Sequence, residues 1–134
     1  MPLITWDDSI SVNIAIIDAQ HKRMIDIINK MHEAMKKGEG KNVIIDILNE
    51  LAQYKKMHFA TEEKYFKEFN YENTETHIYE HHQFAEKIEE LKTKLAQGES
   101  ITIEVLEFVK NWLTHHIKEV DKKYIKCFNE HGLK

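Results

Sequence analysis

The chain has 134 residues, a formal net charge of −4, and 42% hydrophobic and 31% charged residues. This length predicts a single domain, and the composition is typical of a globular protein rather than a disordered one. The negative charge argues against nucleic acid or an anionic membrane surface as a partner, because both require a basic face. The single cysteine excludes an internal disulfide and a cysteine-based metal cluster.

Residues 1–17 are expected to form an extended arm. Four aliphatic residues alternate there with polar or small ones, which is the period of two that is typical of extended chain with one buried face. They are Ile10, Val12, Ile14 and Ile16, and Trp6 is a candidate anchor. The chain begins without a basic signal region, and no apolar run approaches the roughly 18 residues of a membrane span. We therefore expect a cytoplasmic protein.

Four segments with helical periodicity follow the arm. They cover roughly residues 18–37, 41–69, 74–97 and 100–129. Glycine and proline together number only five, too few for the many turns of a β-sandwich or barrel. Short connections between amphipathic helices make neighbouring helices antiparallel. The sequence therefore predicts an all-α protein, an up-down-up-down antiparallel four-helix bundle with an extended N-terminal arm, as one domain over residues 1–134.

The nine histidines are the most unusual feature of the composition. The inward-facing stripe of each helix is identified by the three- and four-residue spacing that keeps side chains on one face. Every one of these stripes contains at least one histidine. These polar residues fall near the start of the first and third helices and near the end of the second and fourth. In an antiparallel bundle those four places lie in one layer. In chain order the residues are His21, His58, Glu62, His77, His81, His116 and Asp121.

A metal site is the simplest explanation for that layer. One buried histidine is usually a hydrogen-bonded core residue, but seven unpaired polar side chains would each cost roughly 1–3 kcal/mol. Imidazoles and carboxylates without a thiolate suit iron, manganese, zinc or copper, and seven ligands are too many for one ion. Two six-coordinate ions with bridging carboxylates and a bridging oxide or hydroxide would keep one position for a small ligand. No Glu-x-x-His or His-Glu-x-x-His motif occurs, which argues against a carboxylate-rich di-iron enzyme and a zinc protease.

Residue spacing on the fourth helix offers two candidate pairs of ligands. His116 and Asp121 are five residues apart, or about 140° on an ideal α-helix. His115 and Glu119 have the better spacing, but they share a face with polar residues. His116 lies instead on the stripe that contains Trp112. The pattern therefore favours His116 and does not by itself select Asp121.

Five stretches of the chain resemble the hemerythrin family, specifically the bacterial single-domain form called bacteriohemerythrin. The resemblance covers nearly the whole chain and includes all the candidate ligands in order. The stretches are Asp18-Ala19-Gln20-His21, His58-Phe59-Ala60-Thr61-Glu62-Glu63, His77-Ile78-Tyr79-Glu80-His81, Trp112-Leu113-Thr114-His115-His116 and Asp121-Lys122-Lys123-Tyr124.

The resemblance implies two non-haem iron ions, bridged by oxide or hydroxide, that bind O2 reversibly. By position, one iron would be held by three histidines and the other by two, with both carboxylates as bridges, including Asp121. The three are His77, His81 and His116, the two are His21 and His58, and the bridges are Glu62 and Asp121. The residues expected to line an apolar ligand pocket are Phe59, Trp112, Leu113 and Ile117.

We expect a binding protein for oxygen carriage, storage or delivery, and not an enzyme, because the inward layer shows no acid or base beyond the seven ligands. The chain is expected to be a monomer whose small-molecule ligand is O2. The alternatives are a di-iron redox enzyme, a scavenger of nitric oxide or peroxide, a sensor of O2 or iron, and an iron store.

Several other polar residues receive simpler interpretations. Glu63 is expected to face solvent, and Tyr54 and Tyr124 are candidates to hydrogen-bond the ligands. The remaining histidines are expected on the surface or flanks of the bundle. They are His32, His82, His115 and His131.

Overall fold

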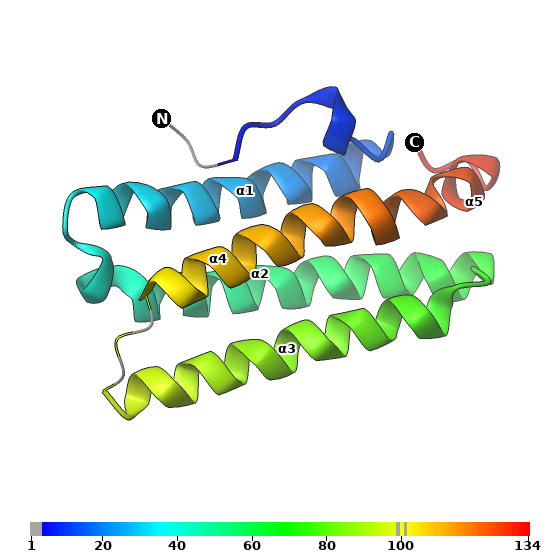
Figure 1. The fold of residues 1–134 in the computed structure, drawn as a ribbon. Helices are drawn as coiled ribbons and strands as arrows, with labels where there is room; N and C mark the ends of the chain where they lie inside the picture. The colour runs from blue at the N-terminus through cyan, green and yellow to red at the C-terminus, as the bar shows by residue number, and fades with distance from the viewer. Residues whose placement is uncertain (1–3, 99, 101) are drawn as a thin grey trace.

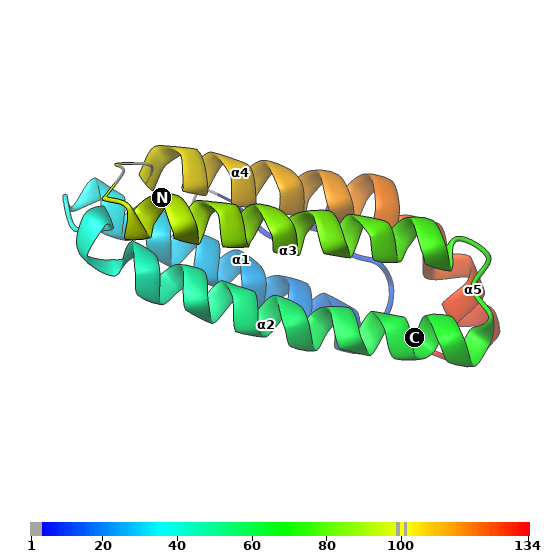
Figure 2. The ribbon, with the colours of Figure 1, turned by 90° about the horizontal axis from the view of Figure 1, so that it is seen from below.

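The structure is a computed structural model that describes residues 4–98, 100 and 102–134, with the side chains of residues 40–42 left aside. Four long helical segments run alternately up and down the bundle, as Figures 1 and 2 show. The expected all-α, antiparallel four-helix bundle is therefore confirmed. The helices are α1 (Ala15–Lys36), α2 (Gly40–Phe69), α3 (Thr74–Ala96), α4 (Thr102–His115) and α5 (Ile125–Glu130). No helix in the described part of the chain is long and apolar enough to cross a membrane.

The inward stripes of the helices form one hydrophobic core. In α1, for example, Ile17, Met24 and Ile28 are almost completely buried, at the spacing that places them on one helical face. Helices α1 and α2 end where the backbone turns left-handed. Gly38 after α1 has a φ of 74° and Asn70 after α2 has a φ of 52°, conformations that Gly and Asn adopt more easily than other residues.

The N-terminal arm lies along the outside of α1 in Figure 1 and contains the short 3-10 helix η1 (Asp8–Ile10). Asp18 ties the arm to α1, because its carboxylate accepts hydrogen bonds from Ser11 Oγ at 2.6 Å and from the Val12 amide at 2.8 Å. The expected anchor Trp6 packs, partly buried, against the core. Val12 is fully buried, so the arm closes one side of the bundle.

The arm is shorter than the expected 1–17, because α1 begins at Ala15. Ile10 and Ile14 are buried as the alternating pattern predicts, but Ile16 is 45% exposed. Once the backbone becomes helical at Ala15, the buried position passes to Ile17, so the period of two ends before Ile16.

The prediction of a single helix over roughly residues 100–129 is wrong in one respect. The segment begins at Thr102 as α4 and continues through a π-helical turn, η2 (His116–Val120), and a 3-10 turn, η3 (Asp121–Tyr124), before α5. A π-helical turn inserts one extra residue between hydrogen-bonded groups, so it rotates everything that follows relative to α4. This irregularity falls on the candidate ligands.

Candidate metal centre

The structure brings all seven candidate ligand side chains into one buried layer, at the end of the bundle where α1 and α3 begin and α2 ends (Figure 1). None of them is more than 2% exposed. The convergence expected from the helix directions is therefore present in the structure. The residues are His21, His58, Glu62, His77, His81, His116 and Asp121.

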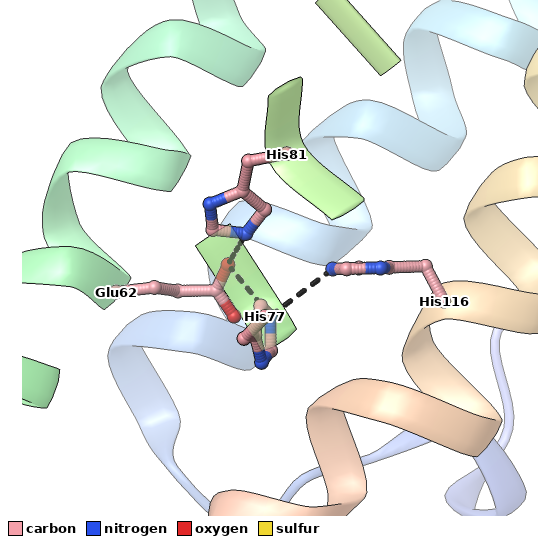
Figure 3. A group of neighbouring side chains, drawn as sticks. All are labelled: Glu62, His77, His81 and His116. Atoms are coloured by element: carbon pink, nitrogen blue, oxygen red, sulfur yellow. Dashed lines mark hydrogen bonds and ion pairs between the residues drawn. The ribbon is translucent and has the colours of Figure 1, made fainter. Parts of the chain in front are cut away.

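Four of these side chains form a first group, drawn in Figure 3: Glu62, His77, His81 and His116. The Nε2 atoms of His77 and His116 are 3.2 Å apart. Glu62 Oε1 lies 3.1 Å from His81 Nε2 and 3.8 Å from His77 Nε2. Three imidazole nitrogens and a carboxylate oxygen therefore face one another in a volume that one metal ion can fill.

A second group combines His21, His58, Glu62 and Asp121. His58 Nε2 lies 3.4 Å from Glu62 Oε1, and His21 Nε2 lies 3.0 Å from Asp121 Oδ2. Glu62 thus belongs to both groups. Asp121 also reaches the first group, because its Oδ1 lies 2.9 Å from His77 Nε2. Both carboxylates stand between the two sets of histidines, where bridging ligands would have to be.

The π-helical turn explains how His116 and Asp121 reach the same site. The Asp121 amide donates to the carbonyl of His116, five residues earlier, which brings onto one face two side chains that a regular α-helix would separate. His116 Nε2 lies 3.0 Å from Asp121 Oδ1. His115 and Glu119 are both exposed, so the alternative pair is not part of the buried layer.

Three of the histidines are held by a second residue through Nδ1. His58 Nδ1 donates to Gln20 Oε1 at 2.6 Å. His81 Nδ1 donates to Glu63 Oε2 at 3.0 Å, and His116 Nδ1 donates to Glu80 at 3.1 Å. A proton held on Nδ1 leaves the lone pair of Nε2 directed at the interior, which is the form in which histidine binds metal.

These outer partners were not expected from the sequence. Glu63 was expected to face solvent only, but it is partly exposed and also contacts His81. Gln20 and Glu80 each precede a ligand in the chain, yet they contact ligands on a neighbouring helix. Their position directly before His21 and His81 was the available signal.

Several polar atoms of the layer have no hydrogen-bond partner in the described part of the chain, although they are fully buried. They are both nitrogens of His21, His58 Nε2, His77 Nδ1, Glu62 Oε2 and both oxygens of Asp121. His21 and Asp121 approach within 3.0 Å, but they lack hydrogen-bond geometry, so they are directed at common space rather than at each other. Unpaired buried groups are costly, and bound metal ions would satisfy the carboxylate oxygens and one nitrogen of each histidine. The residues present therefore fit a metal centre.

Burial and the mutual charges of the layer shift the pKa values of several candidate ligands. Burial and Asp121 raise the pKa of Glu62, but the surrounding imidazoles outweigh them and lower it to about 2. Burial likewise raises the pKa of Asp121, yet His116 and its neighbours hold it well below the usual value. Burial lowers the pKa of His58 to about 3, which leaves it neutral. Burial opposes charge on His116, but Asp121 and Glu80 raise its pKa to about 9, so metal binding there would release a proton.

The four expected pocket residues fall into two pairs with different surroundings. Phe59 stacks on His81 with ring centroids 3.7 Å apart, and Trp112 stacks on His116 at 4.2 Å. Leu113 and Ile117 are buried on another side of the fourth segment, where they line a cavity of about 90 Å³ beneath the arm. The aromatic pair thus shields the first group of ligands, while the aliphatic pair seals the bundle under the arm.

Lys55 was missed by the sequence reasoning. Its side chain is only 2% exposed, and its Nζ has no hydrogen-bond partner in the described chain. The signal was present, because Leu51, Lys55, His58 and Glu62 follow the four-, three- and four-residue spacing of one inward stripe. Burial lowers the pKa of Lys55 to about 7, against the opposing effect of Asp121 and Glu62.

Tyr124 is the second buried group near the ligands. It is fully buried and its hydroxyl has no hydrogen-bond partner among the described residues. Burial, followed by the charges of Glu62 and Asp121, raises its pKa well above the usual value. The expectation that the interior offers no acid or base beyond the seven ligands was therefore wrong. Tyr54, the other candidate partner, is only partly buried.

The remaining histidines lie where they were expected, away from the buried layer. Three of them are exposed and one, His32, is partly buried; the exposed ones are His82, His115 and His131.

Comparisons with known proteins agree with this geometry. Residues 12–128 match the family model described as the hemerythrin HHE cation binding domain. The chain is 33% identical over 128 residues to a bacteriohemerythrin of Clostridium acetobutylicum, covering 92% of this chain and 99% of that protein. It is 32% identical over 131 residues to a bacteriohemerythrin of Methylococcus capsulatus, covering 96% and 99%.

A crystal structure of wild-type hemerythrin superposes with a TM-score of 0.85 at 32% sequence identity, covering 93% of this chain and 97% of that one. The family match spans the four long helices and all seven side chains of the layer. The chain belongs to the hemerythrin family.

Proposed function

We propose that this chain holds two non-haem iron ions, joined by an oxide or hydroxide bridge, and binds O2 reversibly at that centre. His77, His81 and His116 would hold one iron, and His21 and His58 the other. Glu62 and Asp121 would bridge the two. The observation that carries this proposal is that seven potential ligands converge in one buried layer, in two groups that share a carboxylate.

The chain's own residues prepare this site for ligand binding. A pair of ferrous ions, when bound, would supply the two electrons that reduce O2 as it binds and would take them back as O2 is released. Gln20, Glu63 and Glu80 orient the imidazoles, so that the ligand geometry is set before metal arrives. Phe59 and Trp112 stack on two of them and exclude water from one side. Exclusion of water limits leakage of protons into the site, which favours release of O2 unchanged.

We propose oxygen carriage, storage or delivery, and not catalysis, as the role of the centre. A redox enzyme acting on peroxide or nitric oxide is the second candidate, because the buried Lys55 and Tyr124 are acids that such chemistry could use. Sensing of O2 or iron would use the same centre and differ in what responds to it.

The test is the visible spectrum of the iron-loaded, reduced protein before air, after air and after removal of oxygen, with iron measured in the same sample. Two irons per chain, and a colour that appears in air and fades on deoxygenation over several cycles, would support a reversible carrier. Colour that forms once and does not fade, or rapid turnover of peroxide or nitric oxide, would refute carriage and favour the redox candidate.

A further inference from the structure

Lys55 places a buried cation one aromatic ring away from the candidate iron ligands. Its Nζ lies 4.1 Å from the ring centroid of Trp112, 4.9 Å from that of Phe84 and 5.1 Å from that of Phe59. Two of these rings stack directly on His116 and His81. The ammonium is therefore enclosed by rings that themselves border the proposed iron centre.

Nothing in the described chain pairs with this ammonium by hydrogen bond. Aromatic faces attract a cation through their quadrupoles, but they provide no hydrogen-bond acceptor of the strength of a carboxylate. Glu62 and Asp121 are near enough for their charges to favour the ammonium form of Lys55, yet no ion pair joins them to it. A buried lysine without a partner is rare and unfavourable, so its donor capacity remains available to a ligand.

The same side chain also borders a groove in the surface. A groove of about 670 Å³ between α2 and α3 is lined by Lys55, Phe59 and His81, with Phe84 and Ile88 also in its wall. The groove therefore brings a small solute to the side chain of Lys55, whose Nζ is itself buried behind the rings, and to the edge of the ligand layer at His81. The groove wall also carries charged side chains of both signs that reach solvent, and Lys55 is the buried cation among its lining residues. The others are Lys56, Lys92, Glu63, Glu86 and Glu89.

We propose that Lys55 is a specificity-determining residue that makes the ligand site of this hemerythrin favour small monoanions over neutral molecules of similar size. This inference rests on the proposed iron centre. A monoanion that enters beside the ammonium satisfies its charge and donor capacity, whereas a neutral diatomic molecule does neither. In surroundings of low dielectric constant this difference corresponds to a preference on the order of tenfold or more.

The test compares an anionic and a neutral probe in the iron-loaded protein. Azide, a linear monoanion, is titrated into the oxidised protein, and nitric oxide into the reduced protein, with the visible spectrum reporting both affinities. The variants are Lys55→Met, which keeps the side-chain volume and removes the charge, and Lys55→Arg, which keeps a charge. Lys56→Met is the matched control, because Lys56 is the exposed neighbour that also lines the groove.

Lys55→Met is expected to weaken azide binding by about tenfold or more and to leave nitric oxide binding within twofold of the parent protein. Lys55→Arg should retain most of the azide affinity, and Lys56→Met should change neither. Equal azide affinity in the parent protein and Lys55→Met, with two irons bound in both, would overturn the role of Lys55 and leave the iron centre intact. Equal weakening of both probes would also overturn it, since that indicates altered packing. Failure of the parent protein to bind two irons would refute the proposed function itself, and this inference with it.

Discussion

Replacing Lys55 by Met should stabilise the metal-free protein substantially. The folded protein holds the pKa of Lys55 at about 7, compared with 10.5 for an ordinary lysine, and the side chain is completely buried. Folding at pH 7 must therefore bury the ammonium or release its proton, at a cost of about 4 kcal/mol. Methionine has a similar length and is apolar, so it can occupy the same space without that cost. The free energy of unfolding should rise by roughly this amount.

The difference in stability between Lys55→Met and the parent protein should depend on pH. Between pH 7 and pH 10.5 the unfolded chain binds one more proton at Lys55 than the folded chain does, so the parent protein gains about 1.4 kcal/mol of stability per pH unit from this group. The advantage of Lys55→Met should therefore shrink from about 4 kcal/mol at pH 7 to about 1 kcal/mol at pH 10.

Urea unfolding of both metal-free proteins at the two pH values, followed by circular dichroism, measures this difference. Lys56→Met is the control, because the exposed neighbour should change stability by no more than about 0.5 kcal/mol. A Lys55→Met variant that is less stable than the parent protein at pH 7, or whose advantage does not change with pH, would refute the reasoning.

Three further perturbations test the site. His116→Ala should lower bound iron below two per chain while His115→Ala leaves it unchanged, and metal analysis showing the reverse would overturn the choice between these neighbours. Gln20→Ala removes the acceptor for His58 Nδ1 and should weaken iron binding by about 10–100-fold in competition with a chelator; an unchanged affinity would show that this contact does not orient the ligand. Deleting Lys118 shortens the π-helical turn by one residue and should rotate the chain after it by about 100°. Retention of two irons by that deletion variant would contradict the role given to the turn.

Much of the fold and the composition of the ligand layer could be predicted, because both depend on periodicity. Histidines and carboxylates at positions that should be apolar are visible in a helical stripe, and the alternating helix directions place them at one end. His21 is an example, since it lies on a stripe with the buried apolar residues Ile17 and Met24. The same reasoning correctly placed His115 outside the ligand layer.

The parts that could not be predicted depend on local departures from regular helix. The α-helical period gives no reason to join His116 with Asp121, because the π-helical turn that joins them has no signature in the residue pattern. Ile16 was placed inward because the arm was assumed to extend past Ala15. Lys55 was overlooked for a different reason: lysine is seldom buried, although the spacing of Lys55 to His58 and Glu62 fits the inward stripe.

The central claim is that the seven side chains hold two iron ions. The most direct measurement is the iron content of the folded protein after anaerobic loading with ferrous iron and removal of loosely bound metal, set beside the same measurement on Glu62→Ala, which removes a residue common to both ligand groups. The account predicts two irons per chain in the parent protein and fewer than two in the variant. One iron or none in a well-folded parent protein, or two irons in both proteins, would contradict it.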